Sequence, residues 1–200
     1  MKRFSLWLVL GIVAAAVVGI TLAMSRPYQY KGSLIEPPMP APDFSLRQGT
    51  GETFTLSEQK GSVALLFFGY TACPDVCPLT LAEMKRVKSE LGRLADQVEV
   101  VFITVDPERD TPERMSQYVA GFDEKFIGLS GTEEELAPVY KGYGVYRAKR
   151  ETGSAAGYLM DHTAVVYLID PDSNLRLTYA YGTPPEAIAA DIRQVLKNAR

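Results

Sequence analysis

A run of seven residues without a polar side chain, Val63–Gly69, stands just before the chain's only two cysteines, Cys73 and Cys77. Such a run predicts a strand buried on both faces, as at the centre of a sheet. The next residues, Leu79–Leu94, carry apolar side chains at spacings of three and four and predict an amphipathic helix. The chain is therefore expected to fold around a central strand, a cysteine loop and a helix.

The rest of the chain alternates between the two kinds of element. Asp43–Leu46 and Glu52–Leu56 predict a short N-terminal hairpin. Alternating strands and helices that end in a second hairpin predict an α/β domain with a mixed sheet flanked by helices. We expect strands at Val98–Val105, Phe126–Leu129, Ala164–Ile169 and Leu175–Tyr181, one helix after the cap Thr111, one that starts at Thr132–Glu135, and a closing helix at Pro185–Ala199.

The first residues predict an appendage to this domain. Residues 4–25 carry no charge, and about 20 apolar residues cross a hydrocarbon core of roughly 30 Å. A cleaved signal peptide is the alternative, although its apolar region is usually about 7 to 15 residues long. We expect a single transmembrane anchor at residues 1–25, a proline-rich, extended spacer at 26–42 and the folded domain at 43–200.

Charge indicates how the anchor is oriented and which partners are excluded. Lys2 and Arg3 precede the apolar span, and positive residues stay on the cytoplasmic side. The domain is therefore expected to face the periplasm from a single-pass position in a bacterial inner membrane. The net charge of −3 shows no basic excess, so nucleic acid is not an expected partner.

The two thiols and the single histidine, His162, are a possible metal site. Thiolate and imidazole ligands suit copper or zinc better than calcium or magnesium, and an iron–sulfur cluster would need more cysteines. A spacing of four places Cys73 and Cys77 on one face of a helical turn, where they can converge on one ion or on each other. The residues alone leave open copper, zinc, a redox pair and a structural disulfide.

A strand followed by a cysteine loop and a helix is the layout of a thioredoxin-like redox site, where helix amides lower a thiol pKa. His162 precedes the strand expected at Ala164–Ile169. In a thioredoxin-like topology, the segment entering that strand lies beside the redox loop. We therefore expect His162 close to Cys73 and Cys77.

Three segments resemble the Sco/SenC family, copper-handling proteins of cytochrome c oxidase assembly. Cys73–Pro78 is similar to its CPxxCP hexapeptide, Asp161-His162 to its histidine region, and Val105–Glu113 to its acidic segment. The resemblance extends from about Pro42 to the C-terminus. It implies a thioredoxin-like fold and a copper ion, Cu(I) or Cu(II), bound by Cys73, Cys77 and His162.

The resemblance also implies a function. It is that of a membrane-anchored chaperone that delivers copper to the binuclear copper centre of cytochrome c oxidase subunit II. The alternative is a thiol-disulfide reductase that keeps the cysteines of that target, or other periplasmic thiols, reduced, with Cys73 and Cys77 as the catalytic redox pair. A copper donor protein or a thiol reductant would be a further partner.

Neighbouring acids have two interpretations each. Asp161 could supply an oxygen ligand or orient the imidazole, or it could cap a turn. Asp75 could favour a bound cation, or it could stabilise a helix N-terminus. The charged residues of the acidic segment are expected in an exposed loop, as a docking site or as a cap for the next helix: Asp106, Glu108, Arg109 and Asp110.

Overall fold

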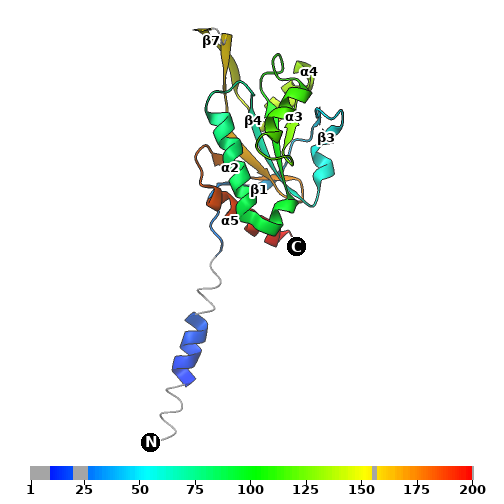
Figure 1. Ribbon diagram of the computed structural model, residues 1–200. Helices are drawn as coiled ribbons and strands as arrows, with labels where there is room; N and C mark the ends of the chain where they lie inside the picture. Colours follow the sequence, from blue (N-terminus) through cyan, green and yellow to red (C-terminus); the bar gives the residue numbers. More distant parts are fainter. Residues whose placement is uncertain (1–9, 20–26, 155–156, 200) are drawn as a thin grey trace, which may run out of the picture.

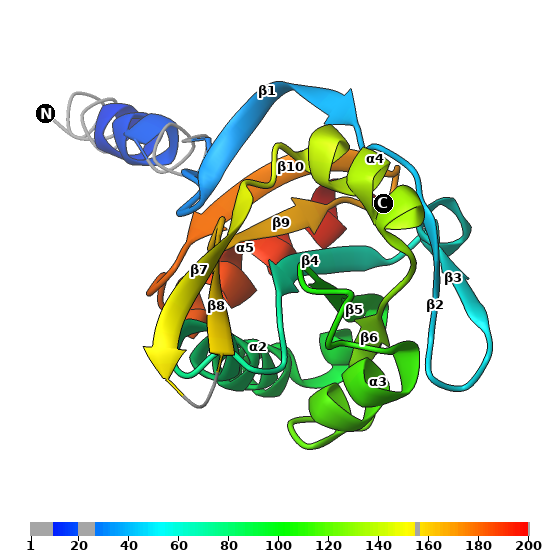
Figure 2. The same cartoon turned by 90° about the horizontal axis from the view of Figure 1, so that it is seen from above.

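The computed structural model describes residues 10–19, 27–154 and 157–199, and its largest element is a six-stranded sheet in the order β1-β10-β9-β4-β5-β6 (Figures 1 and 2). The strands β4, β5 and β6 are parallel, and β9, β10 and β1 continue the sheet in antiparallel fashion. The predicted α/β architecture with a mixed sheet is confirmed. The strands are β1 (Ser33–Pro40), β4 (Val63–Gly69), β5 (Val98–Thr104), β6 (Ile127–Leu129), β9 (Val165–Ile169) and β10 (Asn174–Ala180).

Helices cover both faces of the sheet. Tyr140 and Tyr143 of α4 lie against the ring of Phe68 in β4, with ring centroids 6.3 and 5.6 Å apart. Phe67, the preceding residue in β4, points to the opposite face and stacks on Phe102. The helices are α2 (Val76–Leu91), α3 (Pro112–Ala120), α4 (Glu133–Tyr143) and α5 (Pro185–Asn198), with 3-10 turns at Leu56–Gln59 and Gly92–Gln97.

The central strand β4 has the predicted environment. All seven of its residues are buried, because β5 pairs with one edge and β9 with the other. The expected N-terminal hairpin is also present, as β2 (Ser45–Arg47) paired with β3 (Thr53–Thr55). β4 therefore delivers the cysteine loop from the middle of the core.

The predicted cap Thr111 is confirmed, and the helix expected from Thr132 has a cap of its own. The side chain of Thr111 accepts a hydrogen bond from the backbone amide of Arg114. Thr132 and Glu135 form a capping box at the start of α4, which satisfies two otherwise unpaired donors. Both caps follow a strand–loop sequence, so they fix where the chain turns back over the sheet.

The helix after the cysteine loop starts earlier than expected. α2 begins at Val76 and ends at Leu91, where a 3-10 turn takes over. Pro78 falls within its first turn, where a proline removes no helical hydrogen bond. Cys77 therefore belongs to the helix, whereas Cys73 remains in the preceding loop.

The stretch expected as a spacer contributes a strand. Ser33–Pro40 pairs with β10 at the edge of the sheet, with an irregularity between Leu34 and Met39. An edge strand tolerates prolines because one row of its amides has no partner strand. The buried carboxylate of Asp191 also accepts hydrogen bonds from the amides of Lys31 and Gly32. This corrects the prediction that the whole of residues 26–42 stands outside the domain.

One hairpin was not predicted. β7 (Arg147–Ser154) and β8 (Gly157–His162) pair only with each other among the strands described and project from the domain (Figures 1 and 2). Most of their side chains are polar, so the sequence lacks the apolar alternation that marks a strand. His162 is the last residue of this hairpin.

In the described part of the chain, no helix has both the length and the apolar character needed to span a membrane. Residues 10–19 are helical. The remainder of the predicted anchor lies outside the described residues.

Candidate metal centre

The two cysteines face each other across the start of α2. Cys73 is half-buried, Cys77 is fully buried, and no disulfide joins them. The backbone amide of Cys77 donates to the sulfur of Cys73 at 3.5 Å. The helix N-terminus thus directs an N–H group at one of the two sulfurs, which favours its thiolate form.

Gly69, the last residue of β4, makes room for the buried sulfur. A Cβ atom at this position would lie 2.6 Å from the Sγ of Cys77 and 2.6 Å from the ring of Phe102. No side chain fits there without a shift of the sulfur or of the ring. The glycine therefore sets how closely Cys77 approaches the sheet.

His162 reaches the cysteines from the other side of the loop. Its Nε2 lies 3.5 Å from the Sγ of Cys77, and its Nδ1 lies 3.0 Å from the carbonyl oxygen of Thr163. A carbonyl only accepts, so Nδ1 carries a proton, and Nε2 is the ring nitrogen that faces the sulfurs. The ring packs edge-on against Phe67 and Tyr70, with centroids 6.4 and 5.8 Å away.

These three side chains can hold one metal ion. One ligand atom from each of Cys73, Cys77 and His162 lies within 4.8 Å of the others. Two sulfurs and one nitrogen are the soft donors that copper(I) and zinc prefer. Cys73 and His162 also line an open cavity of about 290 Å³. A fourth coordination position can therefore be reached from outside.

The two thiols have opposite protonation tendencies. The hydrogen bond from the side chain of Cys77 is the main cause that lowers the pKa of Cys73 to about 3, helped by His162 and by the amides of Asp75 and Cys77. The same hydrogen bond, together with burial, raises the pKa of Cys77 above its ordinary value. Without metal, Cys73 is the thiolate and Cys77 keeps the proton.

The two neighbouring acids do not touch the imidazole. Asp161 accepts from Nε of Arg150 at 3.2 Å on the exposed face of the hairpin. The imidazole is oriented by the Thr163 carbonyl, so this corrects the suggestion that Asp161 orients His162. Asp75 is the exposed N-cap residue of α2, and its side chain makes no capping hydrogen bond.

The acidic segment is only in part the exposed charged loop that we expected, because Glu108 is exposed but two aspartates of the segment are buried. Asp106 and Asp110 are 1% and 0% exposed. Asp106 binds Arg109 at 2.5 Å, and Asp110 accepts from the hydroxyl of Thr104 at 2.9 Å. Buried charges of this kind require such partners. Charge alone was the reason for predicting exposure, and the pairing overrides it.

Asp110 supports the cysteine loop, a role that sequence reasoning missed. Its carboxylate accepts from the amide of Thr71 at 3.0 Å and from the hydroxyl of Thr71 at 2.5 Å. Thr71 stands two residues before Cys73. The buried carboxylate therefore ties the start of the cysteine loop to the end of β5, and only the proximity of the two segments in space reveals this.

The fold and the site together define a class of protein. It is a thioredoxin-like α/β domain in which two thiols at the start of a helix meet an imidazole from a separate hairpin. Residues 34–197 match the family model described as SCO1/SenC, and the chain belongs to this family.

Relatives and solved structures agree with the family. The chain is 38% identical over 151 residues to the mitochondrial SCO1 homologue of Homo sapiens, a match that covers 74% of this chain and 50% of that protein. It is 37% identical to a SCO2-like protein of Rickettsia felis, covering 72% and 71% of the two chains.

Two solved structures share the fold. One is Bradyrhizobium japonicum ScoI with copper bound, at 42% identity and a TM-score of 0.71, covering 78% of this chain and 98% of that one. The other is apo Sco1 from Thermus thermophilus, at 35% identity and a TM-score of 0.75, covering 84% and 98%.

Proposed function

We propose that this protein binds a copper ion through Cys73, Cys77 and His162 and acts as a copper chaperone in cytochrome c oxidase assembly. The observation that carries the proposal is the convergence of the three ligand atoms within 4.8 Å. Copper-bound structures of related Sco proteins support the choice of copper over zinc.

The geometry suits a site that gives its ion away. Three protein donors beside an open cavity leave a position for an incoming ligand, whereas a closed four-coordinate site holds its ion. A thiolate of the target would enter this position, and the bonds to the chaperone would then be replaced one at a time. Both cysteines must be deprotonated to bind, so loading displaces the proton of Cys77.

The target and the compartment are part of the proposal. The binuclear copper centre of cytochrome c oxidase subunit II would receive the ion. Residues 1–25 would anchor the chain in a bacterial inner membrane with the domain in the periplasm, because Lys2 and Arg3 precede the apolar span. A copper donor protein would load the site.

The unequal thiols favour one second function, a thiol-disulfide reductase. The Cys73 thiolate would attack a target disulfide and form a mixed disulfide, and the first target thiolate would leave. Cys77, after losing its proton, would attack Cys73 and release the second target thiol. The target gains two electrons, the Cys73–Cys77 pair becomes a disulfide, and an external thiol reductant must restore it.

Copper titration of the reduced domain under anaerobic conditions tests the proposal. We expect one tightly bound equivalent, weaker binding through the two sulfurs alone in His162→Ala, and no binding at this site in the Cys73→Ala/Cys77→Ala double variant. In cells, oxidase activity should fail with either variant. Unchanged binding in His162→Ala, with thiol exchange intact, would favour the reductase instead.

A further inference from the structure

The hairpin that carries His162 is attached to the domain through one of its faces. In the pairing of β7 with β8, Arg147 lies opposite His162 and Lys149 lies opposite Met160. Cross-strand partners share a face, and every second residue along a strand does too. Tyr158, Met160 and His162 therefore point the same way as Arg147 and Lys149, toward the body of the domain.

Tyr158 makes the most contacts on this inner face. Its hydroxyl donates to Asp106 at 2.7 Å, and the guanidinium of Arg109 lies 3.8 Å from its ring centroid. Arg109 also donates to the Tyr158 carbonyl at 3.0 Å and to Asp106 at 2.5 Å. We call these three residues, Asp106, Arg109 and Tyr158, the Tyr158 clasp.

The clasp is anchored on a buried residue of the domain. Asp106 is buried two residues after the end of β5, and it has both Arg109 and Tyr158 as partners. A hydrogen bond to a buried charge is stronger than one between neutral groups. The contact therefore holds the hairpin where polar exposed strands alone would not.

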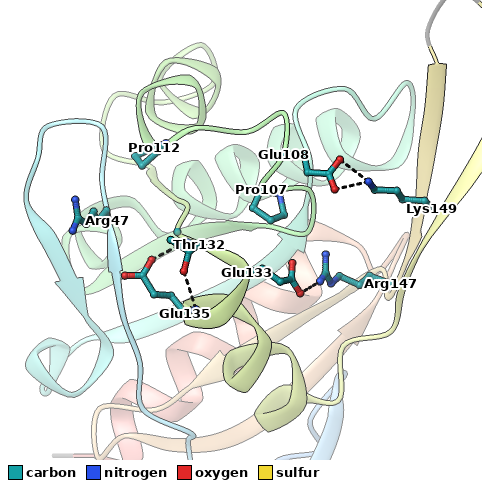
Figure 3. A pocket seen from close by; sticks show the side chains of 10 residues that line it. Arg47, Pro107, Glu108, Pro112, Thr132, Glu133, Glu135, Arg147 and Lys149 are labelled. Atoms are coloured by element: carbon teal, nitrogen blue, oxygen red, sulfur yellow. Dashed lines mark hydrogen bonds and ion pairs between the residues drawn. The ribbon is translucent and has the colours of Figure 1, made fainter.

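Two ion pairs reinforce the clasp from β7. Figure 3 shows Lys149 and Arg147 reaching from this strand to Glu108 and Glu133. Arg147 also donates to the carbonyl of Val105 at 3.2 Å and lies over the ring of Tyr140 at 4.6 Å. These pairs are partly exposed, so they contribute less than the buried carboxylate of Asp106.

We propose that the Tyr158 clasp positions His162 against the two cysteines and thereby sets how fast copper leaves the site. This inference rests on the proposed copper-binding function. With the clasp closed, His162 completes the ligand set. With the clasp open, the hairpin swings away and leaves a two-sulfur site that incoming ligands displace more readily.

The test compares Tyr158→Phe with Tyr146→Phe. Both variants lose one tyrosine hydroxyl near the hairpin, but the Tyr146 side chain is 64% exposed. We expect Tyr158→Phe to release Cu(I) to an excess of chelator about tenfold faster, as is usual for residues that orient a ligand. Tyr146→Phe should match the unaltered protein. In the metal-free protein, amide exchange across β7 and β8 should increase only in Tyr158→Phe.

A double variant shows whether Tyr158 acts through His162. In the His162→Ala background, Tyr158→Phe should add no further acceleration, since the ligand it positions is gone. An equal acceleration of copper release in the His162→Ala background would contradict the role proposed for the clasp. So would an unchanged release rate in Tyr158→Phe alone. If His162→Ala itself bound copper as tightly as the unaltered protein, His162 would not be a copper ligand. That result would contradict the proposed function and is distinct from a failure of the clasp.

A second variant covers the case in which Tyr158→Phe does not fold. Arg109→Lys keeps the positive charge beside Asp106 but loses the planar group that stacks on Tyr158 and donates to its carbonyl. It should also accelerate copper release in the presence of His162 and not in its absence. A folded Arg109→Lys variant with an unchanged release rate would contradict the proposal.

Discussion

The cysteine loop and the β7–β8 hairpin both contribute side chains to the proposed copper site but are built in different ways. The loop joins a fully buried strand to a helix, and Cys77 is 0% exposed. The hairpin stands outside the main sheet and is held mainly by charged and polar contacts. In the proposed copper site, the buried core would hold the two sulfurs in place, and the contacts of the hairpin would hold the imidazole. Copper binding would then depend on both elements, and copper release on the hairpin.

The largest effect is expected from the fixed half. Cys77→Ser replaces a soft thiolate by a hydroxyl, a poor ligand for Cu(I). We expect copper affinity to fall at least about 10³-fold, or about 4 kcal/mol, measured by competition with a Cu(I) chelator. Affinity within tenfold of the unaltered protein would mean that Cys77 is not a ligand.

The support of the loop is expected to matter for stability. Asp110→Ala leaves the donors of Thr71 and Thr104 without their acceptor, at a cost of about 2–4 kcal/mol in the free energy of unfolding. Asp96→Ala is the matched control, because Asp96 and its partner Lys125 are 74% and 68% exposed. The control should lose much less stability than Asp110→Ala in urea unfolding, because solvent screens an exposed ion pair. Equal losses in both variants would refute the role given to Asp110.

The thiol asymmetry predicts an unusual pH dependence. A thiol with a pKa of about 8.5 loses roughly 50-fold in alkylation rate between pH 8.5 and 6.5. The pKa of Cys73 is lowered to about 3, so its thiolate persists across this range and is protonated only as the pH approaches 3. Iodoacetamide labelling of the metal-free protein, read by mass spectrometry, should change less than twofold at Cys73. A 50-fold fall would contradict the assignment.

The smallest effect is expected on the outer face of the hairpin. The side chains of Arg150 and Asp161, which form an ion pair, are both more than half exposed. Arg150→Ala should therefore lower the free energy of unfolding by less than about 1 kcal/mol. Urea unfolding compares this variant with Asp110→Ala. An equal loss in the two variants would show that the exposed ion pair carries as much stability as the buried carboxylate.

The parts predictable from the sequence are those with a local signal. The apolar run of β4 and the caps Thr111 and Thr132 each determine their own structure. The proximity of His162 to Cys73 and Cys77 required a topology as well, because 85 residues separate the imidazole from the second thiol. The thioredoxin-like topology provided that information, because it places the segment before β9 beside the cysteine loop.

The parts that were missed depend on partners distant in sequence. β1 is a strand only because β10 offers an edge, and the prolines in it indicated a spacer. Asp106 and Asp110 carry charges that predict exposure, and their contacts with Tyr158 and Thr71, together with nearer partners, explain their burial. Pairing across the fold, rather than local pattern, decides each case.

X-ray absorption of the Cu(I)-loaded protein tests the central claim most directly, because it counts the atoms bound to the metal. The account predicts two sulfur ligands and one nitrogen ligand, with the nitrogen lost in His162→Ala and retained in Tyr146→Phe. A sulfur-only site in the unaltered protein, or a nitrogen signal that survives in His162→Ala, would contradict it.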